Sequence, residues 1–150
     1  MSENTEKVAE QAAKPAPKKG MTRGRIVAAV VVAVVIVVGC GKMGMELANR
    51  LVAEGHDVTV IDRSEAVLEH CLDTLDVMTV KGSGVSFDAL TEADVKHADI
   101  VIASTMSDET NMLTCLTAKR LGAKYAIARI RDPEYLGSLS SLSKELSIDY

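Results

Sequence analysis

Short apolar runs alternate with longer amphipathic segments along most of this chain. In the amphipathic segments the apolar residues recur every three or four positions, which is the spacing of one buried helix face. The apolar runs are short enough to be strands buried in a sheet. The predicted strands are residues 33–38, 57–62, 77–81, 98–103 and 125–130. This alternation predicts an α/β fold, a Rossmann-like doubly wound parallel sheet covered by helices.

The connections between these strands predict their order in the sheet. Right-handed crossovers with a reversal after the third strand give five strands in the order 3-2-1-4-5. In such a sheet the ligand crevice lies at the carboxyl ends of the first and fourth strands. Residues that follow those strands are therefore the first candidates for a binding site.

The helical segments carry their own start and stop signals. The first begins in a glycine-rich turn and ends at Gly55, while Ser64 and Ser86 are predicted to cap two short helices. Asp132 followed by Pro133 is a typical start for a last helix. The predicted inward residues of the first helix are Gly44, Leu47, Ala48, Leu51 and Val52.

Two later helices are predicted from leucine spacing. One runs to about Leu121, and Gly122 is its predicted stop signal. Its predicted inward residues are Leu113, Leu116, Thr117 and Leu121, and those of the last helix are Leu136, Leu139, Leu142 and Leu146. Asp108 and Glu109, near the start of the first of these, are simplest to interpret as acids that complement a helix dipole.

The first 24 residues differ from the rest in composition. They are rich in Ala, Lys, Glu and Pro, and residues 1–25 carry six Lys/Arg against three Glu. Such a segment has too little apolar surface to form a core. We therefore expect a disordered basic tail over residues 1–24 and one nucleotide-binding domain over residues 25–150.

The apolar run before the glycine turn is longer than one strand requires. Residues 26–38 are 13 consecutive apolar residues, fewer than the ~20 that span a bilayer. With basic residues before it, the run resembles a signal sequence, and Val37-Val-Gly-Cys40 resembles a lipoprotein cleavage box. The strand interpretation is favoured, because the preceding basic region contains acids and because Gly39 belongs to the turn described next. Residues 26–32 have no assigned role.

The turn after the first strand is a dinucleotide-binding fingerprint. It reads Gly39-Cys-Gly-Lys-Met-Gly44, and an acid, Asp62, ends the second strand 18 residues later. In this pattern Gly39 permits the tight turn, Gly41 leaves room for a pyrophosphate, and Gly44 lets the helix pack on the sheet. The N–H groups at the helix start then face the phosphates. This context makes the glycine pattern a strong signal.

The acid at position 62 predicts which nucleotide is bound. Asp62 is placed to accept hydrogen bonds from adenosine ribose hydroxyls, and its charge repels a 2′-phosphate. NAD(H) or ATP/ADP is therefore favoured over NADP(H), although Arg63 leaves an opening for the latter.

Further candidate residues follow the other strands at the same sheet edge. They are Gly82, Ser83, Ser104, Thr105, Met106 and Arg129, which join Cys40, Lys42 and Met43 of the turn. Lys42 suits a phosphate contact or a solvated helix start about equally. Arg129 suits a phosphate or a subunit boundary, or else a salt bridge to Asp132 or Asp99. The segment Gly82–Gly84 is either a plain turn or a ribose contact.

Composition and spacing exclude several functions. The net charge of −4 argues against nucleic acid as a partner. The three cysteines show no C-x-x-C spacing and suit reduced, packed thiols. No metal-ligand spacing and no nucleophile–base pattern is present, so we expect no catalytic residues and no enzyme activity.

Four segments resemble one family. Val37-Val-Gly-Cys-Gly-Lys-Met-Gly44, Gly55-His-Asp-Val-Thr-Val-Ile-Asp62, Ser107-Asp-Glu-Thr-Asn111 and Ile127-Ala-Arg-Ile-Arg-Asp-Pro-Glu-Tyr135 resemble the TrkA N-terminal (RCK/KTN) domain. The likeness covers about residues 33–150. It implies nucleotide contacts at Gly39–Met43, Asp62, Ser83, Thr105–Met106 and Arg129. It also implies that the chain lacks the last strand and the crossover helix of the family.

The resemblance implies a regulatory function. Members of this family bind NAD(H) or ATP/ADP in the cytoplasm and relay that state to a membrane potassium-translocating subunit. The resemblance therefore implies a peripheral position at the inner face of the membrane and homo-oligomers, either dimers or rings. The alternative from the residues is the cofactor-binding half of an NAD-dependent dehydrogenase, but the five strand–helix units leave little length for its substrate pocket.

Overall fold

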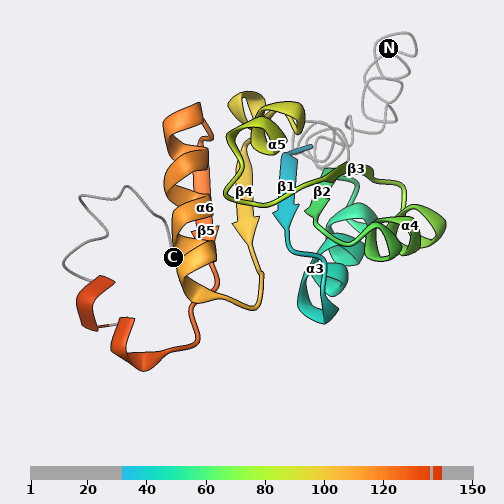
Figure 1. Cartoon of the computed structure of the whole chain (residues 1–150). Helices are drawn as coiled ribbons and strands as arrows, with labels where there is room; N and C mark the ends of the chain where they lie inside the picture. Colours follow the sequence, from blue (N-terminus) through green and yellow to red (C-terminus); the bar gives the residue numbers. More distant parts are fainter. Residues whose placement is uncertain (1–31, 136, 140–150) are drawn as a thin grey trace, which may run out of the picture. The chain divides into compact units, whose positions relative to one another are not determined.

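The computed structural model describes residues 32–135 and 137–139, which form a parallel sheet with helices on both faces (Figure 1). The strand order β3-β2-β1-β4-β5 confirms the predicted doubly wound topology. The strands are β1 (Val34–Val38), β2 (Asp57–Asp62), β3 (Met78–Lys81), β4 (Ile100–Ala103) and β5 (Tyr125–Ala128). The predicted tail, residues 26–31 and the leucines at 136, 142 and 146 lie outside the described residues.

Three of the described helices begin at a serine that caps their first turn. The helices are α3 (Lys42–Ala53), α4 (Glu65–Thr74), α5 (Phe87–Glu92), the 3₁₀ helix η1 (Val95–His97) and α6 (Asp108–Leu121). Ser64, Ser86 and Ser107 each accept a hydrogen bond from a backbone N–H in the first turn of α4, α5 and α6. The first two of these caps confirm the prediction. Helical residues resume at Pro133, as the Asp132-Pro133 pair predicts.

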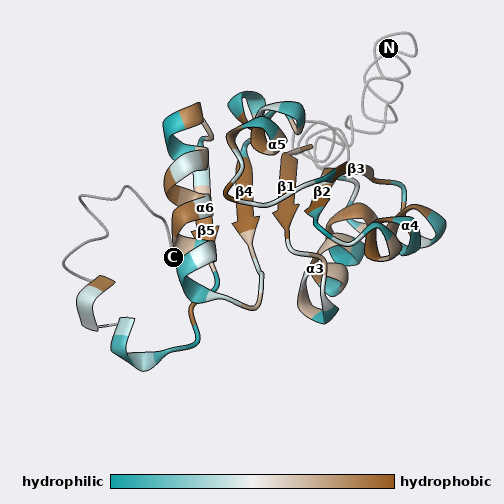
Figure 2. Ribbon diagram, viewed as in Figure 1, coloured by the Kyte–Doolittle hydropathy of each residue, from teal (hydrophilic) through white to brown (hydrophobic). Residues whose placement is uncertain are grey.

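Alternate residues of the central strands supply two separate cores. Val35 and Val37 of β1 pack with α3 and α4, whereas Ile36 and Val38 pack with α5, η1 and α6. The central strands β1 and β4 are therefore apolar along their whole length, and the helices are polar mainly on the side away from the sheet (Figure 2). This two-sided burial explains the continuous Val and Ile runs in the sequence.

Strand β5 is covered by described residues on one face only. Ala126 and Ala128 pack against Cys115 of α6, while Tyr125 and Ile127 alternate with them and are partly exposed. The predicted strand also ends two residues early, at Ala128 rather than at residue 130. Small residues on the covered face allow α6 to lie close to the sheet.

The buried face of α6 differs from the predicted one. The helix buries Asn111, Thr114, Cys115 and Ala118, whereas Leu113 is 50% exposed and its predicted inward position is wrong. The reason is close packing. A Cβ atom built on Gly84 would lie 2.9 Å from Thr114 Oγ1, so leucines have no room on that face. Leu121 does pack against the core, as predicted.

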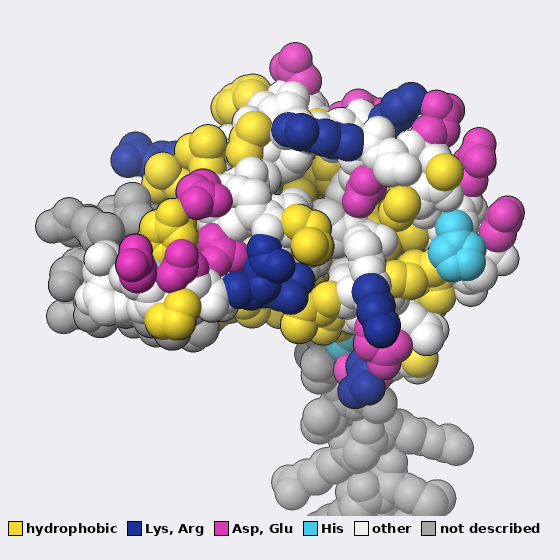
Figure 3. All heavy atoms as spheres, turned by 60° about the horizontal axis from the view of Figure 1, so that its bottom comes forward, with side chains coloured by type: hydrophobic (Ala, Val, Ile, Leu, Met, Phe, Trp, Pro, Cys, Tyr) yellow, Lys and Arg dark blue, Asp and Glu magenta, His cyan; other side chains and the backbone are white. Residues whose placement is uncertain are grey.

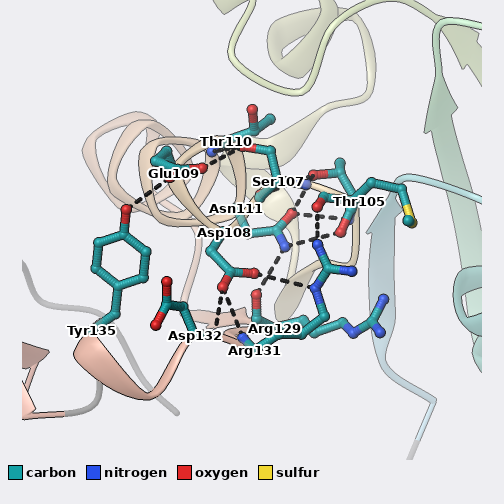
Figure 4. Close-up of polar contacts among 11 residues, drawn as sticks. Thr105, Ser107, Asp108, Glu109, Thr110, Asn111, Arg129, Arg131, Asp132 and Tyr135 are labelled. Atoms are coloured by element: carbon teal, nitrogen blue, oxygen red, sulfur yellow. Dashed lines mark hydrogen bonds and ion pairs between the residues drawn. The ribbon is translucent and has the colours of Figure 1, made fainter.

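The first residue of α6 fixes the segment that follows β5. Asp108 is 6% exposed, and its Oδ2 accepts hydrogen bonds from the backbone N–H groups of Arg131 (2.9 Å) and Asp132 (2.8 Å). These two donors lower the pKa of the carboxyl group. The acid therefore does more than complement a helix dipole, because it ties the start of α6 to the chain beyond β5 (Figure 4).

Replacing Asp108 with Asn is expected to lower the thermal midpoint at pH 7 by several degrees. A carboxyl group with a lowered folded-state pKa stabilises the fold above its unfolded pKa of about 3.9, and this contribution is lost as the pH falls further. The difference in midpoint between wild type and variant should therefore shrink below about pH 4. Thermal unfolding followed by circular dichroism from pH 3 to 8 measures it.

Asp88→Asn is the matched control, because Asp88 also lies in a first helical turn but is exposed. Equal losses in the two variants, or a difference that persists at pH 3, would show that the buried backbone contacts of Asp108 are not responsible.

Candidate functional site

A cavity of about 1060 Å³ opens at the carboxyl ends of the strands. Twelve of the fourteen predicted site residues line it, all except Cys40 and Gly44. They are Gly39, Gly41, Lys42, Met43, Asp62, Arg63, Gly82, Ser83, Ser104, Thr105, Met106 and Arg129. The volume is sufficient for a nucleotide-sized ligand. Figure 3 looks onto this end of the sheet, where Lys and Arg side chains project.

The glycine turn is held by close backbone contacts. Gly39 has φ +87°, and a Cβ there would lie 2.8–2.9 Å from Thr105. A Cβ on Gly44 would collide with the Gly39 carbonyl oxygen, which also accepts a hydrogen bond from Ser104 Oγ at 2.8 Å. Gly41 has open space around it. Gly39 and Gly44 thus permit the close contacts of the turn, and Gly41 leaves the backbone accessible from the cavity.

The start of α3 differs from the other α-helix starts in the described chain. Its N-cap is Gly41, which makes no side-chain cap, and its first turn contains no acid. By contrast, α4, α5 and α6 each have a serine cap and an acidic residue in the first turn. The first N–H groups of α3 therefore remain available to an anion in the cavity.

Asp62 is fixed by two backbone donors. Its Oδ2 accepts from the Cys40 N–H and its Oδ1 from the Ser64 N–H, both at 2.8 Å. Each carboxylate oxygen has a further lone pair for a ligand hydroxyl. The acid thus links the glycine turn to the end of β2 and also borders the cavity.

Cys40 enters the site only through its backbone. Its side chain is 4% exposed, and its Sγ lies 3.1 Å from Cys71 Sγ, so a direct thiol contact with a ligand is excluded in this conformation. Burial is the main cause that raises the pKa of the Cys40 thiol to about 12. Cleavage before Cys40 would also remove β1, the central strand, which argues against the lipoprotein interpretation.

Basic residues from three segments surround the cavity. Arg63 Nη2 donates a hydrogen bond to Ser83 Oγ at 2.9 Å, which brings the β2 and β3 exits together. Lys42 and Arg129 also line the cavity, and neither forms an ion pair with a residue that the structure describes. These positive charges remain available to an anionic ligand.

The two salt bridges considered for Arg129 are not formed. Asp99 precedes β4, where its Oδ2 accepts from the Val34 N–H at 2.9 Å. It therefore lies at the opposite end of the strands from Arg129. The Asp132 Oδ1 atom accepts from the Glu134 N–H at 2.9 Å. Two interpretations of Arg129 therefore stay open, namely a contact with a phosphate and a position at a subunit boundary.

One buried side chain positions two walls of the cavity. Asn111 is fully buried, and its Oδ1 accepts from the Thr105 N–H (2.9 Å) and Thr105 Oγ1 (2.6 Å). Its Nδ2 donates to the carbonyl oxygens of Thr105 (3.2 Å) and Arg129 (2.8 Å). Figure 4 shows this amide between the β4 and β5 exits. Asn111 therefore fixes the backbone that carries Thr105 and Arg129.

Sequence reasoning missed several cavity residues. Glu46 and Arg50 line it from α3, where they form an ion pair at 2.8 Å, and Arg131 lines it two residues beyond Arg129. The four-residue spacing of Lys42, Glu46 and Arg50 was a usable signal, because residues four apart share one helix face.

The described residues contain neither a metal-binding cluster nor a helix that could span a membrane. Between positions 32 and 139, omitting 136, no group of three or more His, Cys, Asp or Glu side chains is arranged to hold a metal ion. Within the same described part, no helix is both long enough and apolar enough to cross a bilayer.

Solved structures share this fold. The TrkA-N domain of the inner membrane protein ybaL from Escherichia coli has a TM-score of 0.69 at 17% identity, covering 80% of this chain and 86% of that one. The GsuK channel bound to NAD gives 0.64 at 20% identity, covering 79% and 21%. The Kef C-terminal domain of Shewanella denitrificans in its AMP-bound form gives 0.61 at 19%, covering 73% and 67%.

Curated proteins resemble the sequence itself. A Trk system potassium uptake protein TrkA homolog of Methanothermobacter thermautotrophicus is 33% identical over 114 residues, which are 76% of this chain and 51% of the relative. The TrkA protein of Vibrio alginolyticus is 38% identical over 113 residues, 75% and 25% respectively. The chain thus spans from a quarter to a half of these relatives. The TrkA-N domain family profile matches residues 35–149, and the chain belongs to that family.

Proposed function

We propose that this chain is a nucleotide-binding regulatory domain of a potassium transport system. The observation that carries the proposal is the uncapped start of α3, which faces a cavity bordered by Asp62 and by Lys42 and Arg129, two cations without an ion pair to any described residue. Backbone N–H groups and positive charges bind phosphates, and a carboxylate binds ribose hydroxyls. The proposal assigns no chemical reaction to the chain.

The proposed ligand is NAD(H) or ATP/ADP. The adenosine ribose is placed at Asp62, and the phosphates lie against the Gly39–Gly44 turn and Arg129. Solved structures of the same fold are described as bound to NAD, ADP and AMP. Those ligands share an adenosine and at least one phosphate. Asp62 is suited to bind the ribose hydroxyls of the adenosine, and the glycine turn is suited to bind the phosphate.

The proposed regulation acts through assembly. A nucleotide changes the activity of a membrane subunit only if it binds two assembly states with different affinity. Converting a mostly closed population into a mostly open one requires about 5.5 kcal/mol of differential binding, summed over the subunits. We propose homo-oligomers at the cytoplasmic face of the membrane, attached to a potassium-translocating subunit. Nucleotides of different length and charge would be distinguished at the glycine turn and Arg129.

Ligand titration tests the proposed function. Thermal unfolding of the full chain is measured with increasing NAD, NADH, ATP, ADP, AMP and NADPH. A ligand that binds only the native state raises the unfolding midpoint. At a ligand concentration one hundred times the dissociation constant, it adds about 2.7 kcal/mol to the free energy of unfolding. We expect at least one adenine nucleotide without a 2′-phosphate to do so, and NADPH to act more weakly than NADH. No shift with any of them would contradict the proposal.

Two glycine substitutions separate folding from binding. Gly44→Ala should destabilise the fold by about 3 kcal/mol, because its Cβ collides with backbone that cannot move easily. Gly41→Ala should leave the unfolding midpoint unchanged, because its φ of −66° suits alanine and no atom lies near the added methyl. The methyl group should nevertheless displace the phosphates and weaken nucleotide affinity about tenfold, or ~1.4 kcal/mol.

Urea unfolding and calorimetry measure these two quantities for each variant. Unchanged nucleotide affinity in Gly41→Ala would show that the ligand does not approach this part of the turn.

Arg129→Ala should weaken binding of ADP and NAD by roughly tenfold to a hundredfold. A hydrogen bond to a charged group contributes about 1.5–3 kcal/mol, which corresponds to this range. Adenosine, which has no phosphate, should bind equally well to wild type and variant. Arg120→Ala is the control, because Arg120 is an exposed cation near the end of α6 and does not line the cavity.

Isothermal calorimetry with the three ligands measures the effect. If Arg129→Ala weakens adenosine as much as ADP, the arginine supports the fold of the site and does not bind phosphate.

A further inference from the structure

Three sulfur atoms meet directly behind the glycine turn. Cys40 Sγ lies 3.1 Å from Cys71 Sγ, and the Met45 Sδ lies 3.9 Å from the first and 3.7 Å from the second. The three residues come from the turn, from α4 and from α3. The two thiols are thus already in contact, although 31 residues separate them in sequence.

The thiol pair lies in an apolar environment. Cys40 is 4% exposed and Cys71 is completely buried, within the core cluster shared by β1, β2, α3 and α4. In the described part of the chain, the two sulfurs have hydrogen-bond contacts only with each other and with Met45. Each thiol is therefore the nearest reaction partner of the other.

Cys40 is mechanically coupled to the proposed nucleotide site. It lies between Gly39 and Gly41, both of which line the cavity. Its backbone N–H donates to Asp62 Oδ2 at 2.8 Å. Any movement of the Cys40 side chain toward α4 therefore acts on the glycine turn and on the acid proposed to bind ribose.

We propose that Cys40 and Cys71 are an oxidisable dithiol, which a peroxide converts to a disulfide and which thereby weakens nucleotide binding. The first half of this inference is independent of any ligand. The second half rests on the proposed function. The pair would make the domain responsive to oxidants in addition to nucleotides.

The chemistry requires one molecule of peroxide as a two-electron oxidant. A thiolate of the pair attacks one peroxide oxygen, so that an S–O bond forms, the O–O bond breaks and, with a proton, water leaves. The second sulfur then attacks the sulfenic acid, an S–S bond forms, the S–O bond breaks and a second water leaves. Two thiols lose two electrons and two protons in total, and the peroxide is reduced to two waters.

The geometry sets the expected direction of the effect on binding. A disulfide bond is about 2.05 Å long, so the sulfurs must approach each other by about 1 Å from their present separation of 3.1 Å. Binding constellations tolerate displacements of only about 0.5 Å. The oxidised turn should therefore present its N–H groups and Asp62 less well to a nucleotide, and we expect about tenfold weaker binding.

The rate of oxidation should depend strongly on pH. Burial raises the pKa of the Cys40 thiol to about 12, and only the thiolate is nucleophilic. Oxidation should therefore accelerate between pH 7 and pH 9. Because both thiols are buried and the pKa of Cys40 is raised, oxidation at neutral pH should be slow and should require sustained exposure to peroxide.

Peptide mapping tests the first half of the proposal. The full chain is treated with hydrogen peroxide at pH 8.5, quenched with an alkylating reagent, digested without reductant and analysed by mass spectrometry. We expect a peptide pair joined through Cys40 and Cys71, with a loss of two hydrogens that dithiothreitol reverses. The Cys71→Ala variant, whose change lies outside the cavity, must lack the joined pair. Unlinked, overoxidised or unreacted thiols would overturn the proposal.

Calorimetry on the same samples tests the second half. Reduced and oxidised wild type are titrated with ADP and NAD, and reduced Cys71→Ala serves as the control with expected wild-type affinity. A tenfold loss on oxidation corresponds, by linkage, to a shift of ~30 mV in the reduction potential of the pair when nucleotide is bound. Equal affinities in the two redox states, with the disulfide present, would overturn the regulatory half. An absence of binding in the reduced protein would instead contradict the proposed function, and the mapping would still decide the dithiol.

Discussion

The contact between Gly44 and the Gly39 carbonyl oxygen is the constraint on which the rest of the site depends. No side chain fits between the first turn of α3 and the end of β1, so the helix axis is fixed against the sheet at this point. This close approach directs the uncapped start of α3 toward the cavity. It also places the Gly39 carbonyl within reach of Ser104 Oγ, which connects the β1 exit to the β4 exit.

Short polar side chains connect the remaining loops at this sheet edge. Asp62, Asn111 and Asp108 each accept from backbone N–H groups of a different chain segment. These contacts consume acceptor capacity, and among the described residues the cavity cations Lys42 and Arg129 form no ion pair. The cavity thus combines a fixed backbone with positive charges on long side chains, an arrangement that suits an anionic ligand.

The sequence predicted the sheet order, the glycine turn and most cavity residues because each depends on local pattern. Apolar runs indicate buried strands, and glycines before a helix indicate close backbone approach. The inward face of α6 was mispredicted because leucine spacing indicates a core only where the neighbouring layer leaves room, and Gly84 and the alanines of β5 leave none.

The packed, reduced thiols were predicted and all three cysteines are free and buried, but the contact of Cys40 with Cys71 and the backbone contacts of Asp108 could not be predicted. Both depend on partners that are distant in sequence, namely Cys71 for the thiol and Arg131 for the carboxylate. A residue type does not reveal which distant segment its side chain or carboxylate will contact. Arg50 lies on the same helix face as Lys42 but was missed. Its four-residue spacing from Glu46 is typical of a solvent-exposed ion pair on a helix, which needs no ligand to explain it.

The hydrogen bonds of Asn111 restrict insertions and deletions in the two loops that follow β4 and β5. The Asn111 amide bonds both the Thr105 N–H after β4 and the Arg129 carbonyl after β5. An insertion or deletion in either segment would move one of these groups and break its hydrogen bond to the shared amide. Loops normally accept such changes independently. Here the two loops must change together or keep their present lengths, and new sequence is tolerated more readily at the opposite end of the sheet.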